Sequence, residues 1–245
     1  MPLAPLTAVI PAPPTPPTTP ATFDQALHDR SPCDHLLRHF RFRHPTAPAT
    51  LESILGHGGE LWLVSDGGAI PLTDRGSFGF VLATHDLVLL EGGGHVPAGS
   101  EDMSSCRAEL CGGWVLFWLL RKFQLHFTID LHDSLKLYTF CDSDSALARM
   151  SSSSVAFHRF HPHGCLRTDY DIEASAYKAS QHLPLVFGKV QGHADTKTPN
   201  RELTWPEQLN GMADVIATAQ LATSNPRFHL PFNPAARAEF RLHDP

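Results

Sequence analysis

Apolar and polar residues follow a regular pattern from residue 61 onward, first with the period of strands and then with the period of a helix. Residues 61–66 (LWLVSD) predict a short buried strand. Residues 76–84 and 87–96 predict two more strands, joined around His85 by a connection short enough for a hairpin. We therefore expect these three strands to be antiparallel neighbours.

A long apolar segment follows these strands. Residues 103–123 predict a helix that is nearly apolar on all sides and therefore central, with Gly112 and Gly113 permitting close approach to a sheet. After this helix the pattern predicts strands at 135–142 and 185–192, and helices directly after residue 142, at 171–183 and at 206–222, the last with Pro206 in its first turn. The order β-β-β-α-β-α-α-β-α predicts an α/β fold with a mixed five-stranded sheet, three antiparallel strands and then parallel strands, and helices on both faces.

The first sixty residues are less regular. Residues 1–22 are dominated by Pro, Thr and Ala, which predicts a disordered leader; docking of this Pro-rich segment on an aromatic-lined groove is the alternative. Helical patterns occur at 23–30 and at 47–58, where we expect Thr50 to cap a short helix and Gly56 to end it. The basic sequence HLLRHFRFRH between them either contacts phosphates or is a surface segment.

Four segments follow from this pattern: a disordered leader (1–22), a partly helical basic linker (23–60), a catalytic domain (61–222) and a C-terminal tail (223–245). A length of 245 residues with 42% hydrophobic residues suits one domain with appendages.

Charge and cysteine content limit the possible partners and compartments. A formal net charge of -6 excludes nucleic-acid binding by bulk electrostatics, so a local basic patch or metal ions must hold such a partner. Five cysteines without a CxxC pair indicate a reduced intracellular protein, cytoplasmic or nuclear. The most apolar stretch, residues 110–120, is too short to cross a bilayer, so no membrane contact is expected. We expect a monomer.

Four acidic residues have contexts that suit a metal site. Asp66 and Asp142 each end an apolar strand pattern, whereas Glu109 and Asp214 lie in helical patterns. Such residues can converge at one edge of a sheet, where unpaired acids are unfavourable unless cations bind between them. Two structural alternatives stay open: Asp142 could only cap the following helix, and Glu109 could form a buried salt bridge with an arginine.

Five short motifs occur in a characteristic order: SDGG (65–68), SSCRAEL (104–110), FCDS (140–143), VQGHAD (190–195) and LNGMADVIA (209–217). Together they resemble the type 1 ribonuclease H family, and most closely the ribonuclease H modules of retroelement polyproteins that accompany a reverse transcriptase. The resemblance covers residue 61 to about residue 221, roughly two thirds of the chain. It implies a ribonuclease H-like fold.

The resemblance also implies a function: endonucleolytic hydrolysis of the RNA strand of RNA–DNA hybrids with two Mg2+ ions, for which Mn2+ substitutes. By resemblance, Asp66 bridges both ions, Glu109 and Asp142 hold the ion on the leaving-group side, and Asp214 holds the ion that activates water. His193 would assist proton transfer and product release. The residues expected to bind substrate are Gly67, Ser105, Arg107, Ser143 and Asn210, the last one helical turn before Asp214.

The expected partners are the hybrid and a reverse transcriptase of the same element. The long segment 193–214 resembles the retroelement members of the family. Residues 142–193 lack a Trp-rich basic helix, so the cations available there are scattered: Arg149, Arg159, Arg167 and Lys178.

The alternative function is a catalytically weak or inactive remnant that binds nucleic acid or protein. A related exonuclease or integrase is disfavoured because the fourth acid follows LNGMA on a helix.

Two further patterns have weaker interpretations. A cluster of His158, His161, His163 and Cys165 could bind zinc but has no recognised finger spacing. The triplet Gly92–Gly93–Gly94 lacks a following Lys-Ser/Thr and a helix, so it is not a phosphate-binding loop; we expect a bulge or a strand end there.

Overall fold

The computed structural model describes residues 23, 36, 39–97, 103–158, 169–194 and 202–223. The predicted leader (1–22) and almost all of the predicted tail (223–245) lie outside these residues. Also outside them lie most of the cluster considered for zinc and two of the scattered cations, namely His161, His163, Cys165, Arg159 and Arg167.

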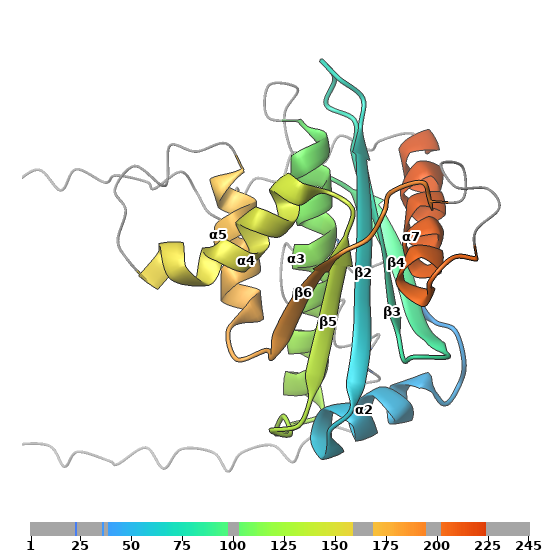
Figure 1. Ribbon diagram of the computed structural model, residues 1–245, viewed down its shortest axis with the longest axis vertical. Coiled ribbons are helices and arrows are strands. Elements are labelled where there is room, and N and C mark those ends of the chain that lie inside the picture. Colours follow the sequence, from blue (N-terminus) through green and yellow to red (C-terminus); the bar gives the residue numbers. More distant parts are fainter. Residues whose placement is uncertain are drawn as a thin grey trace, which may run out of the picture.

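A mixed sheet forms the centre of the molecule (Figure 1). It has six strands in the order β1-β4-β3-β2-β5-β6. The pairs β1–β4, β4–β3 and β3–β2 are antiparallel, whereas the pairs β2–β5 and β5–β6 are parallel. The strands are β1 (Phe40–Phe42), β2 (Glu60–Ala69), β3 (Gly76–Ala83), β4 (Val88–His95), β5 (Lys136–Cys141) and β6 (Leu185–Lys189).

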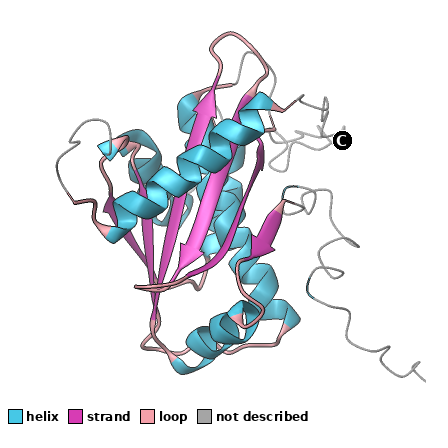
Figure 2. Ribbon diagram, turned by 90° about the vertical axis from the view of Figure 1, so that its right-hand side faces the viewer, coloured by secondary structure: helices cyan, strands magenta, loops and turns pink. Residues whose placement is uncertain are grey.

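Helices cover both faces of this sheet. One face carries α3 (Ser105–His126), α4 (Asp144–His158) and α5 (Tyr170–Ser180), while α7 (Trp205–Ala222) crosses β2, β3 and β4 on the other (Figures 1 and 2). A further helix, α2 (Ala47–His57), lies at the end of the sheet where β2 begins. No helix among the residues that the structure describes has the length and apolar content needed to cross a membrane.

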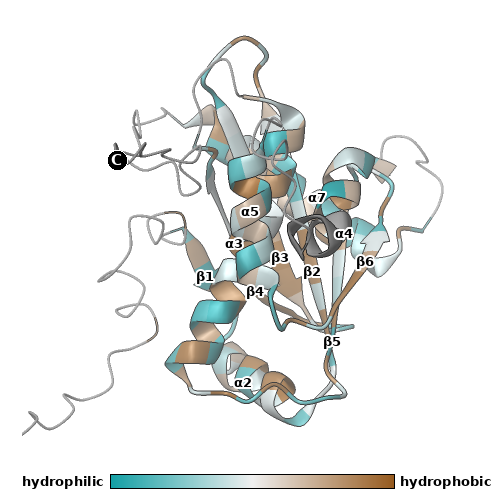
Figure 3. Ribbon diagram, turned by 90° about the vertical axis from the view of Figure 1, so that its left-hand side faces the viewer, coloured by the Kyte–Doolittle hydropathy of each residue, from teal (hydrophilic) through white to brown (hydrophobic). Residues whose placement is uncertain are grey.

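Alternation of side chains along β2 and β3 produces two separate cores. Leu63 and Phe80 point toward α3 and belong to the larger core, whereas Val64 and Val81 point toward α7 and belong to the smaller one. Because both faces of these strands are covered, their residues are apolar almost without interruption. Figure 3 shows apolar colours on the central strands and on parts of α2 and α3.

The predicted α/β class is confirmed, as is the mixed sheet with helices on both faces. The sheet has six strands rather than five because β1, in the segment expected to be a basic linker, pairs with β4. Leu51 and Leu55 of α2 are also fully buried in the larger core. Residues 40–57 are therefore part of the packed structure.

Three local predictions were wrong. Gly92, Gly93 and Gly94 lie inside β4 and pair regularly with β3, and the bulge lies at Leu82/Ala83. The helix expected to be capped by Thr50 begins at Ala47, because Pro48 fits its first turn. The helix ends at His57, not at Gly56, and is followed by Gly58, whose φ of 91° favours glycine.

Gly211 offers a test of local helix stability. This residue is exposed on α7, and a Cβ there would meet no atom within 4 Å. Gly211→Ala is expected to raise the free energy of unfolding by about 0.5–1 kcal/mol, because alanine loses less backbone entropy in a helix. Denaturant unfolding measures this, with Gly112→Ala as the control that should destabilise, since its Cβ would lie 2.9 Å from the Ser65 Cβ. A lower midpoint for Gly211→Ala would contradict the expectation.

Candidate metal centre

Asp66 and Asp142 lie side by side on neighbouring parallel strands. Val64 of β2 is opposite Phe140 of β5, so Asp66 and Asp142, each two residues further along, are at the same height. Asp142 directly follows β5, as predicted. Asp66 does not end its strand, because β2 continues to Ala69 by pairing with β3; it lies instead just past the end of the parallel pairing with β5.

Glu109 reaches this point from the first turns of α3. The helix begins after Ser104, whose side chain accepts a hydrogen bond from Arg107 N at 3.0 Å. Its backbone then packs directly on β2, since a Cβ at Gly67 would lie 2.4 Å from the Ala108 carbonyl carbon. This close approach needs glycine at position 67 and brings the Glu109 carboxyl to the two aspartates.

Asp214 and Asn210 approach from the opposite face on α7. Two glycines let α7 lie close to the sheet: a Cβ at Gly79 would lie 2.1 Å from Ala213 O, and one at Gly93 would lie 2.7 Å from Ile216 Cγ2. Gly79 is the β3 partner of Asp66, so this contact is made beside the acidic residues. Asn210 Nδ2 donates to Asp66 Oδ2 at 3.4 Å.

The charges of the four acidic residues act on one another. Burial, together with the charges of Asp142 and Asp214, raises the pKa of Asp66 to about 6. Burial, followed by the charges of Asp66 and Asp142, raises the pKa of Glu109 to about 10. Glu109 therefore keeps its proton at neutral pH when no cation is bound.

These residues fit a hard divalent cation. Within the described part of the chain, no lysine or arginine forms an ion pair with Asp66, Glu109 or Asp142, so the salt bridge considered for Glu109 is not formed there. Carboxylate oxygens are the ligands that Mg2+ and Mn2+ prefer. A bound cation would offset the burial and the neighbouring negative charges that raise the two pKa values.

His193 and Asp214 lie together at the exposed side of the cluster. The distance from His193 Nδ1 to Asp214 Oδ2 is 3.8 Å, and their side chains are 61% and 39% exposed. The loop that carries His193 touches the site through Gly192, because a Cβ there would lie within 2 Å of Asp142 Oδ2. The sequence did not identify Gly192 as a site residue, although it lies in the VQGHAD motif.

Cys141 is a second site residue that was not predicted. Its buried thiol donates to Glu109 Oε2 at 3.3 Å, and burial together with Glu109 raises the pKa of the thiol above its usual range. One ligand atom each from Glu109, Cys141 and Asp142 lie within 4.8 Å of one another. The motif FCDS contained this signal, because it places a cysteine directly before Asp142, the aspartate predicted to bind metal.

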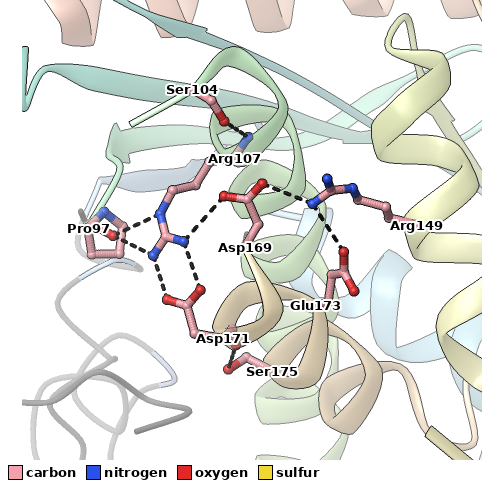
Figure 4. A network of polar contacts seen from close by, with 8 residues as sticks. All are labelled: Pro97, Ser104, Arg107, Arg149, Asp169, Asp171, Glu173 and Ser175. Carbon is pink, nitrogen blue, oxygen red and sulfur yellow. Dashed lines mark hydrogen bonds and ion pairs between the residues drawn. The ribbon is translucent and has the colours of Figure 1, made fainter. Parts of the chain in front are cut away.

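Arg107 does not lie in the predicted substrate-binding position. Its side chain is 6% exposed, its Nη1 donates to Asp171 Oδ1 at 2.8 Å, and its Nη2 donates to Pro97 O at 2.9 Å (Figure 4). Asp169 Oδ1 is 3.5 Å from Nη1. The guanidinium therefore joins α3 to α5 inside the protein, where a substrate cannot reach it.

Arg149 belongs to the same network of ion pairs as Arg107 and Asp169. Its Nη1 lies 2.9 Å from Asp169 Oδ2 and 3.2 Å from Glu173 Oε1 (Figure 4). Arg149, one of the scattered cations expected to be available for substrate, is therefore engaged in holding α4 against α5. Lys178, by contrast, is exposed on α5.

The other predicted substrate-binding residues occupy varied positions. Ser105 is exposed at the start of α3, and Gly67 and Ser143 are half-buried. Ser143 Oγ accepts from Ala146 N at 3.3 Å, so Ser143 and not Asp142 caps α4. Asn210 is only 3% exposed, so its contact is with Asp66 more than with solvent.

The raised pKa values predict how pH and metal affect stability. The ordinary pKa values are 3.8 for Asp66 and 4.5 for Glu109, and the folded values are about 6 and about 10. The folded protein binds these two protons more tightly than the unfolded chain does, so protonation of Asp66 and Glu109 stabilises the fold. This stabilisation is fully present at pH values below the ordinary pKa values, and it is lost as the pH rises through the folded pKa values. Mg2+ competes with the protons, so its stabilising effect should grow over the same pH range.

Thermal unfolding in Mg2+ and in a chelator, at about pH 5 and about pH 8, measures this difference. The Mg2+-induced rise in Tm should be larger at the higher pH, and Mg2+ at 100 times its Kd is expected to add about 2.7 kcal/mol. NaCl at matched ionic strength is the control. An equal rise at both pH values would contradict the expected link to Asp66 and Glu109.

Comparison with known proteins was made by sequence and by structure. No protein-family model matches the sequence, and no curated protein matches it significantly. Similar solved structures include RNase H1 from Halobacterium salinarum NRC-1, with 16% identity, a TM-score of 0.39, and coverage of 66% of this chain and 98% of that one. They also include the PFV RNase H domain (13% identity, TM-score 0.46, coverage 66% and 93%) and LC11-RNase H1, isolated from compost, in complex with an RNA/DNA hybrid (16% identity, TM-score 0.44, coverage 66% and 96%).

Proposed function

We propose that this protein is a divalent-metal-dependent endonuclease that hydrolyses the RNA strand of RNA–DNA hybrids. The observation that carries this proposal is the convergence of Asp66, Glu109, Asp142 and Asp214 from four different elements, with raised pKa values at Asp66 and Glu109. The substrate class is the one implied by the resemblance of the five sequence motifs, in their order, to the type 1 ribonuclease H family. Recognition of 2′-hydroxyls across the minor groove would make the cleavage nearly independent of sequence.

The chain's own residues have separate tasks in this proposal. Two divalent ions, when bound, would supply an activated water and stabilise the leaving oxygen. Asp66, central among the acids and oriented by Gly67 N at 2.6 Å and by Asn210, would contact both ions. Glu109 and Asp142 would hold one ion, and Asp214 the other.

His193 is proposed to move protons at the exposed side of the site. An imidazole exchanges protons readily near neutral pH, and the His193 ring is open to solvent beside Asp214. It could therefore take a proton from water at the site and release it to bulk solvent. The motifs and the long segment 193–214 support a retroelement origin, in which a reverse transcriptase of the same element is the proposed partner.

A cleavage assay with the RNA strand labelled tests the proposal directly. In Mg2+ or Mn2+ the protein should cut an RNA–DNA hybrid internally and leave 5′-phosphate and 3′-hydroxyl ends, while single-stranded RNA and duplex DNA stay intact. A hybrid that stays intact in both metals at several protein concentrations would overturn it. Binding of the hybrid without cleavage would instead favour a binding remnant.

A further inference from the structure

The thiol of Cys141 lies at the base of the acidic cluster. Cys141 is the last residue of β5, is fully buried, and points toward Glu109, to which its Sγ donates at 3.3 Å. The backbone N–H of Ser143 donates to the same sulfur at 3.3 Å, which holds it in place. A soft sulfur ligand therefore lies beside hard oxygen ligands.

Glu109 is the most deeply buried acid of this group. It is only 5% exposed. No basic side chain among the described residues forms an ion pair with its carboxyl. The thiol of Cys141 is its neutral donor. One ligand atom each of Glu109, Cys141 and Asp142 lie within 4.8 Å of one another, as expected for side chains that can close on a single ion.

The choice of ion follows from ligand chemistry. Thiolate is a poor ligand for Mg2+ but a strong one for Zn2+ and similar soft ions. With bond lengths of about 2.3 Å to sulfur and about 2.0–2.2 Å to oxygen, ligands of a tetrahedral ion lie roughly 3.3–3.8 Å apart. Small side-chain movements from the present separation would reach that geometry.

We propose that Glu109, Cys141 and Asp142 form a ligand set for a thiophilic divalent ion such as Zn2+, and that this ion blocks the Mg2+-dependent reaction. When the ion binds, the thiol of Cys141 and the carboxyl of Glu109 each release a proton to solvent, so that a thiolate and a carboxylate face the ion. Since Glu109 and Asp142 belong to both ligand sets, the two kinds of ion exclude each other. The blocking effect rests on the proposed function, whereas binding of the soft ion does not.

Binding is tested on the full chain with Cd2+, because cadmium–thiolate charge transfer gives an ultraviolet absorption band. Cys141→Ser should remove a band that the matched control Cys106→Ser retains, since Cys106 lies on α3 outside this ligand set. Excess Mn2+ should also weaken the band in the unaltered protein, which tests the shared ligands without any substitution. An identical band in the Cys141→Ser protein, or one unaffected by Mn2+, would overturn the proposal.

Inhibition is tested by adding Zn2+ to the hybrid-cleavage reaction in Mg2+. Half-inhibition of the Cys141→Ser protein should need at least about 10-fold more Zn2+ than the unaltered protein, as expected for loss of one interaction at a metal site. Circular dichroism checks that the variant is folded, and Cys141→Ala replaces it if it is not. Absence of cleavage with an intact Cd2+ band would refute only the proposed function; cleavage with equal Zn2+ sensitivity would refute only the inhibitory site.

Discussion

Asp142→Asn is expected to reduce hybrid cleavage by more than about 100-fold, because even outer partners of metal ligands cost 10–100-fold when removed. Asp142 lies at the height of Asp66 and shares its environment with Glu109. Asparagine keeps the shape of the side chain but loses the negative charge and one oxygen ligand. Cleavage rates at saturating hybrid, measured over a Mg2+ titration, provide the test.

Folding should be almost unaffected by Asp142→Asn. Ser143, not Asp142, caps α4, and Asp142 itself is only half-buried. Loss of its charge should also lower the raised pKa values of Asp66 and Glu109, so the metal-free protein becomes slightly less sensitive to pH.

Asp144→Asn is the matched control for this prediction. Asp144 is an exposed acid two residues further along, at the start of α4, where it pairs with Lys189. Its replacement removes the same charge outside the cluster and should leave cleavage within about 2-fold, as is usual for an exposed ion pair. Equal rates for Asp142→Asn and the unaltered protein would refute the site assignment.

Gly79→Ala is expected to have the second largest effect, on both stability and cleavage. The new Cβ would lie 2.1 Å from Ala213 O, on the α7 backbone, which cannot move aside as a flexible side chain could. Overpacking of this kind costs about 1–3 kcal/mol. Displacing α7 would also separate Asp214 and Asn210 from Asp66, so cleavage should fall even in the fraction that remains folded.

Denaturant unfolding and cleavage by the folded protein measure the two effects separately. Gly68→Ala is the control, since Gly68 lies on the neighbouring strand β2 and a Cβ there would meet nothing within 4 Å. An unchanged unfolding midpoint for Gly79→Ala would show that α7 does not need this glycine.

The hydrophobic pattern predicted the central strands and helices well, yet it missed β1. Phe40 and Phe42 alternate with Arg41 and Arg43, which is a strand pattern, but the charges made the segment resemble a linker. Arg41 Nε donates to Glu91 Oε1 at 2.8 Å across the β1–β4 pair. The buried partner on β4 that makes this strand possible lies about fifty residues away in the sequence and could not be inferred locally.

In the candidate site, too, local patterns predicted some features and missed others. The order of Asp66, Glu109, Asp142 and Asp214 on alternating strands and helices was predictable from local patterns. Arg107 was misplaced because its partner, Asp171, belongs to α5, and a local pattern does not reveal which element a side chain meets. Cys141 was missed because only the packing of α3 on the sheet, over β2 and β3, brings Glu109 to its thiol.

By itself, the sequence determined the order of the elements, the α/β class and the identity of the acidic residues, since these depend on periodicity and residue type over short stretches. Only the tertiary structure decided that β1 completes the sheet, that Arg107 is buried and that Cys141 joins the acids. It also decided the raised pKa values of Asp66 and Glu109. The physical reason is that burial and charge interactions depend on distances between residues far apart in the chain, which here are set by backbone contacts at Gly67 and Gly79.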